Sequence, residues 1–223
     1  MKRFIREVYE EFILVFKGKT LDTLIPPIVF LIFLNLYTLN TALIVSFLLS
    51  LIILIYRMIK KEKQTYAFFG IIAVGIASIF SYLGNNPSTY FIPDILGSAL
   101  SLVLAIISLI IKKPLAAYAS HFTRGWPLSW FWRKDVLPAY MEVTILWSLY
   151  FLLRTTIEIS FYANNDVQNF VWFNTLIVFP LLIGILTVSY LYGIWRLRKL
   201  KGPGVDEHIE NKEPPYKGQT RGF

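Results

Sequence analysis

Apolar residues fill six long runs of the chain, and polar residues gather in the connections between them. Each run approaches or exceeds the roughly 20 residues that cross the hydrocarbon core of a bilayer as a helix. Only a turn at Leu39 and Asn40 separates the first two runs, which predicts an antiparallel hairpin. The pattern predicts an all-α membrane protein with six transmembrane helices between residues 21 and 196. The runs cover residues 21–38, 41–56, 66–83, 91–111, 139–162 and 170–194.

The two ends of the chain carry different patterns. In residues 1–20 apolar side chains recur three or four positions apart, and charged residues take the opposite face. No long uncharged core precedes a small-residue cleavage site, so this segment does not resemble a signal peptide. It predicts an amphipathic helix on the cytoplasmic membrane surface, with a short helix packed under the bundle as the open alternative. Residues 197–223 contain few apolar side chains and are predicted to form a disordered cytoplasmic tail.

Charge sets the predicted orientation. The formal charge is +8, and 21 of the 22 Lys and Arg residues lie in the two terminal segments or in the connections after the second and fourth runs. The alternate connections contain none. The positive-inside rule therefore places both termini in the cytoplasm, in a multi-pass protein of the cytoplasmic (inner) membrane. Clusters of this kind contact anionic lipid head groups, and nucleic acid is not an expected partner.

The connection between the fourth and fifth runs is rich in tryptophan. Trp126, Trp130 and Trp132 lie close to Arg124 and His121. This composition predicts an interfacial segment anchored in the membrane by its aromatic rings. A pocket for a lipid head group at this place is the alternative.

The remaining basic residue, Arg154, lies near the middle of the fifth run. A charge there costs about 2.5–3.5 kcal/mol on insertion scales, so partners are expected. Glu158 follows one helical turn later, and the predicted topology brings Asp94, Asn35 and Asn174 to a similar depth. The hypothesis is that Arg154 pairs with Glu158 and Asp94, donates hydrogen bonds to the side-chain carbonyl oxygen of Asn35 or Asn174, and lines a cavity open to the outside.

Few familiar catalytic motifs are present. The sequence has no GxxxxGK[ST], HExxH or GxSxG pattern, no cysteine, and no histidine with a second ligand at helical spacing. No metal or other cofactor is therefore predicted, and an enzyme is not the leading expectation.

Three functions stay open. The first is a transporter-like protein that binds or moves a small solute, ion or lipid through a polar cavity centred on the Arg/Glu/Asp cluster. The second is a non-catalytic scaffold of the cell envelope, whose cluster only holds the helices together. The third is a lipid-modifying intramembrane enzyme, with His121 and Arg124 as its candidate groups. A homo-oligomer is possible in each case.

Three stretches carry a resemblance to a known group. ALIVSFLLSLIILIYRMIKKEK, IPDILGSALSLVLAIISLIIKKPLAAY and WRKDVLPAYMEVTILWSLYFLLRTTIEISFY resemble the intracellular septation protein A-like family and its uncharacterised membrane relatives, over about residues 19–196. The shared features are the Lys-Lys-Pro-Leu end of the fourth run and Arg154 in the fifth. The resemblance implies a small inner-membrane protein associated with envelope integrity or septation, without an established reaction.

Overall fold

The computed structural model describes residues 21–60, 65–220 and 222–223, so the amphipathic helix predicted for residues 1–20 lies outside them. The described chain is helical and contains no strand. Its elements are α2 (Leu21–Leu36), α3 (Leu39–Ile59), α4 (Thr65–Gly84), η1 (Pro87–Phe91), α5 (Ile92–Ile110), α6 (Leu115–Arg124), α7 (Leu128–Phe131), α8 (Leu137–Ala163), α9 (Val167–Trp172), η2 (Phe173–Ile177), α10 (Val178–Leu200) and α11 (Val205–Ile209).

Four helical stretches in the described chain are long and apolar enough to cross a membrane: α3, η1 with α5, α8, and the continuous stretch from α9 to α10. The first and third predicted spans correspond to α2 and α4, whose described apolar portions are shorter, at Ile25–Leu36 and Gly70–Gly84. An all-helical membrane protein is therefore supported. The number of six spans stays a prediction.

The chain divides into two units, each of which is described by itself. The first contains the described part of Met1–Ile95 together with Glu158–Ile177. In it α2 and α3 form the predicted hairpin and α4 packs against α3. The Thr38 hydroxyl accepts a 3.4 Å hydrogen bond from the Thr41 amide, which caps α3 where the chain reverses. Stacked rings of Phe30 on Tyr90 fix the core of this unit.

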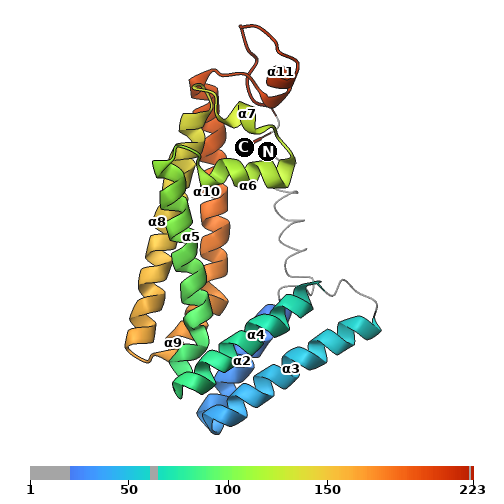
Figure 1. Ribbon diagram of the computed structural model, residues 1–223, viewed down its shortest axis with the longest axis vertical. Helices are drawn as coiled ribbons and strands as arrows, with labels where there is room; N and C mark the ends of the chain where they lie inside the picture. Colours follow the sequence, from blue (N-terminus) through green and yellow to red (C-terminus); the bar gives the residue numbers. More distant parts are fainter. Residues whose placement is uncertain (1–20, 61–64, 221) are drawn as a thin grey trace. The chain divides into compact units, whose positions relative to one another are not determined.

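The second unit contains Leu96–Ile157 and Val178–Phe223. Its portions of α5, α8 and α10 run side by side (Figure 1). A buried hydrogen bond of 3.0 Å from the Thr155 hydroxyl to Ser98 joins α8 to α5. The short helices α6 and α7 occupy the place of the predicted interfacial segment, and Phe122 on α6 leaves 82% of its surface exposed.

An aromatic core fills this unit near the C-terminal end of α10. The Trp130 side chain has no exposed surface, and its ring lies against those of Trp126, Phe131 and Tyr140. The indole Nε1 of Trp130 donates a 2.9 Å hydrogen bond to the Pro203 carbonyl. Protein therefore surrounds Trp130, and Trp126 is 6% exposed, whereas Trp132 is half-buried. This position differs from the lipid anchoring that the sequence predicts for Trp130, because the C-terminal chain supplies the partner that a buried indole requires.

That part of the chain, residues 202–220 with 222 and 223, is called the C-terminal strap below. The sequence predicts disorder for it, but the structure packs it on the aromatic core. The Phe223 ring stacks on Tyr140 with centroids 4.3 Å apart and closely approaches Gly193 of α10, where a Cβ would collide with it. Two apolar side chains, Phe223 and Val205, are buried in that core. The composition of the segment does not predict that these two side chains are buried, because they are few and lie 18 residues apart.

Candidate intramembrane charged site

Arg154 and Glu158 lie one helical turn apart on α8, in the same order as the sequence predicts. The Glu158 side chain has no exposed surface, and Arg154 is half-buried. The helix that carries them is 27 residues long and is one of the four long enough to span a bilayer. A helix long enough to span a membrane therefore buries the Glu158 carboxylate fully in protein and leaves the neighbouring Arg154 residue partly exposed.

A stripe of small polar side chains continues from Glu158 along the same face of α8. Thr155, Ser148 and Thr144 follow at helical spacings of three, seven and four residues. Thr155 bonds to Ser98 of α5, and the Thr144 hydroxyl accepts a 3.2 Å hydrogen bond from the Ala116 amide of α6. The polar face thus binds neighbouring helices over much of its length. Its regular spacing is a signal that a helical projection of the fifth run could have found.

The other three predicted members of the cluster lie on separate elements. Asp94 lies in the first turn of α5 and is exposed, a place where the helix dipole favours a negative charge. The amide groups of Asn35 and Asn174 donate to carbonyls of their own helical turns, Leu31 at 2.9 Å and Phe170 at 3.4 Å. Their convergence on Arg154 stays a prediction.

Asn174 lies in a π-helical turn, and Pro180 is the sequence feature near it that indicates an irregular helix. The segment η2 is a π-helical turn, and it ends three residues before Pro180. Pro180 lacks the amide that would bond to the carbonyl four residues earlier, and its ring crowds that carbonyl. A wider turn just before proline removes this conflict, and α10 continues to Leu200.

A second charged group joins α8 to α10. The Glu142 carboxylate accepts hydrogen bonds from Arg196, with Nε to Oε2 at 2.7 Å and Nη2 to Oε1 at 2.8 Å, and from the Tyr192 hydroxyl at 2.7 Å. All three side chains are half-buried. Fork geometry of this kind fixes orientation as well as charge. Sequence patterns predict no partner for Glu142, because 54 residues separate it from Arg196.

The candidate groups for metal or enzyme chemistry are used in ordinary contacts. Within the described ranges, no group of three or more His, Asp or Glu side chains could hold a metal ion. His121 Nδ1 lies 2.6 Å from the Trp126 carbonyl, and His208 Nε2 lies 3.0 Å from the Ser129 hydroxyl. The Arg124 guanidinium lies over the Trp126 ring, 4.9 Å from its centroid. These contacts bind the α6 region together.

Comparison with known proteins gives one match. The model of a family described as "Protein of unknown function (DUF3159)" matches residues 18–199, which is more than half of the chain. No curated protein and no solved structure matches. The resemblance to the septation protein A-like group gains no support from these comparisons and stays a prediction. The chain belongs to the DUF3159 family, whose function is unknown.

Proposed function

We propose that this protein is a six-span membrane protein that binds, and by extension moves, a small polar solute, ion or lipid at Arg154 and Glu158. One observation carries the proposal. Glu158 is wholly buried on a helix long enough to cross the bilayer, and Arg154 one turn away keeps part of its surface accessible.

Energy is the first argument for a functional site. Each ionisable group in the middle of a membrane raises the free energy of insertion by roughly 2.5–3.5 kcal/mol. Apolar side chains at these two positions would not carry this cost. An opposite charge at i+4 offsets part of this cost but not all of it, since Arg followed by Glu is the less favourable order in a helix. Ionisable residues retained at this cost mark ligand or proton pathways by default.

Orientation is the second part of the proposal. With α2 and α4 counted as spans, the 21 basic residues outside the spans all fall on one side of the membrane, which is the cytoplasmic side. In this topology α8 leads from the cytoplasm outward, so Arg154 and Glu158 lie at and beyond the midplane. The site would open to the outside.

A structural scaffold is the second candidate. The hydrogen bonds of Thr155 to Ser98 and of Ala116 to Thr144 support it, because they show that the polar face of α8 holds other helices. A scaffold of the cell envelope, the role that the septation resemblance implies, would keep Arg154 sealed from water and would lose assembly when the residue is replaced.

The experiment is a comparison of Arg154→Gln with the wild-type protein in nanodiscs, using the thermal unfolding midpoint in a panel of ions, small acids and phospholipids. We expect a compound that stabilises the wild-type protein to bind about tenfold or more weakly to Arg154→Gln, because a charged hydrogen bond is lost. Lys134→Gln, which removes an exposed cation outside the spans, is the matched control and should bind as wild type. Equal binding by all three proteins would leave the scaffold as the better account.

A further inference from the structure

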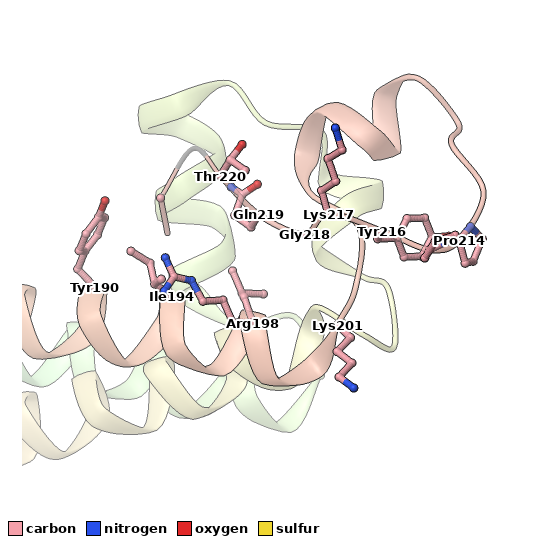
Figure 2. A pocket seen from close by; sticks show the side chains of 13 residues that line it. Tyr190, Ile194, Arg198, Lys201, Pro214, Tyr216, Lys217, Gly218, Gln219 and Thr220 are labelled. Atoms are coloured by element: carbon pink, nitrogen blue, oxygen red, sulfur yellow. The ribbon is translucent and has the colours of Figure 1, made fainter.

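A cavity of about 1010 Å³ lies between the C-terminal end of α10 and the strap. Figure 2 shows residues 190–201 on one side of it and residues 214–220 on the other. Its volume is at the upper end of the range for small-molecule sites. It therefore has room for a ligand larger than a single inorganic ion.

Every charged side chain that lines the cavity is a cation. These residues are Arg198 of α10, Lys201 directly after it and Lys217 of the strap, and among the described residues no carboxylate belongs to the lining. In Figure 2 the Arg198 guanidinium lies along α10 below Gln219 and Thr220, whereas the ammonium groups of Lys201 and Lys217 point in opposite directions. In the part of the chain that the structure describes, Arg198 has no salt bridge. Arg198 is thus the cation best placed to meet a bound anion.

An uncharged donor supports the same conclusion. The Gln219 side chain is oriented by its Oε1, which accepts a 3.1 Å hydrogen bond from the Val205 amide. This bond directs Nε2 the other way, and Nε2 is buried without a hydrogen-bond partner in the described residues. A buried donor without an acceptor costs free energy, and a ligand that brings acceptor oxygens would remove that cost.

We propose that this cavity binds a phosphate-bearing anion, either a phospholipid head group or a soluble phosphate ester. Phosphate oxygens accept hydrogen bonds only, so they match a lining whose charged groups are all donors. The cavity begins within ten residues of the end of α10, the last helix long enough to span a membrane. In the proposed topology this is the cytoplasmic head-group level, where anionic lipid phosphates are concentrated.

A neighbouring cation, Lys199, serves as a control that distinguishes binding in the cavity from a general attraction between the protein and anionic membranes. Lys199 is adjacent to Arg198 and exposed, but it lies over the Trp195 ring, 5.0 Å from the centroid, and does not line the cavity. Arg198→Gln and Lys199→Gln remove the same charge from the same turn of α10. A nonspecific surface effect would weaken binding equally in both, whereas a built site would not.

The test uses the full chain in phosphatidylcholine nanodiscs, with glycerol 1-phosphate and inorganic phosphate as probes in titration calorimetry. We expect glycerol 1-phosphate to bind, with about a tenfold or greater loss in Arg198→Gln and less than about a twofold change in Lys199→Gln. Unchanged unfolding midpoints would show that both variants are folded. Absence of binding by both probes together with no lipid retention that depends on Arg198, or an equal loss in the two variants, would overturn the proposal.

A second arm identifies the source of the phosphate. The protein is purified from nanodiscs of equal phosphatidylglycerol and phosphatidylcholine, and the retained lipid is measured by native mass spectrometry. Retention of phosphatidylglycerol that Arg198→Gln loses and Lys199→Gln keeps would identify a lipid head group. Binding of glycerol 1-phosphate without lipid retention would identify a soluble phosphate ester. Neither arm depends on Arg154, so failure here leaves the proposed intramembrane function intact.

Discussion

Replacing Trp130 with alanine is expected to lower the free energy of unfolding by about 3–5 kcal/mol, the usual range for removing a fully buried tryptophan. Trp130 has no exposed surface and packs against the rings of Phe131 and Tyr140. The substitution also removes the hydrogen bond that the Trp130 indole donates to the Pro203 carbonyl, one of the polar contacts between α7 and the strap. Denaturant unfolding in detergent, followed by tryptophan fluorescence, measures the loss.

Trp195→Ala is the matched control for this prediction. Trp195 is 52% exposed, so its removal should change the free energy of unfolding by less than about 1 kcal/mol. Similar small losses in both variants would contradict the burial of Trp130. They would instead favour the anchoring role in lipid that the sequence predicts for this residue.

Replacing Glu207 with alanine is expected to free the strap from the aromatic core. Its carboxylate accepts hydrogen bonds from three backbone amides, those of Gly204 at 2.9 Å, Lys217 at 2.7 Å and Gly218 at 3.1 Å. The Gly218 amide nitrogen is itself part of the Lys217–Gly218 peptide bond, which is a trypsin site, and the Lys217 amide lies on the residue before that bond. Cleavage there should accelerate on the order of tenfold in the variant, because opening of the segment then costs less.

Two internal references accompany the cleavage experiment. Lys212 is exposed, so the rate of cleavage after it should change little. Glu210→Ala removes an exposed carboxylate whose only described ion pair is with the equally exposed Lys212, and such pairs contribute little. Cleavage at Lys217 that is no faster in Glu207→Ala than in Glu210→Ala would contradict the role given to Glu207.

The same carboxylate makes the strap sensitive to acid. The hydrogen bond from the Gly204 amide, followed by those from Lys217 and Gly218, holds the pKa of Glu207 below its usual range. A carboxylate with a lowered pKa in the folded state stabilises that state above its ordinary pKa of about 4.3, and this contribution is lost as the pH falls through the lowered value. Hydrogen exchange of the Lys217 and Gly218 amides, corrected for intrinsic rate, should therefore stay slow from pH 7 to 5 and become faster below about pH 4.

The sequence predicts the membrane class and the position of the charged pair because both depend on short-range patterns. Apolar runs near 20 residues identify spanning helices, and the spacing of Arg154 and Glu158 within one run places them a turn apart. The helix bounds still differ from those of the runs by a few residues, as where α2 ends at Leu36 and the first run at residue 38, since an apolar run does not fix where a helix ends.

The contacts missed by the sequence join residues far apart in the chain. Glu142 and Arg196 are separated by 54 positions, and Trp130 and Pro203 by 73. No local periodicity links such pairs. The strap is the extreme case, because its average composition is polar while, among its described residues, Val205 and Phe223 are the members of the aromatic core. The cationic cavity exists because the strap packs beside α10. From the sequence, the lining residues of the strap appear only as part of a charged tail.

The absence of cysteine from the chain allows the most direct test of the proposed outward-facing site. Single-cysteine variants at Arg154, Leu149 and Asn164 are treated in intact cells with a small membrane-impermeant thiosulfonate. We expect labelling at position 164, in the proposed outer connection, and at position 154, but not at position 149, an apolar and exposed position of α8 that would face lipid. Labelling at position 164 without labelling at position 154, in a protein that remains folded, would contradict a water-connected site at Arg154.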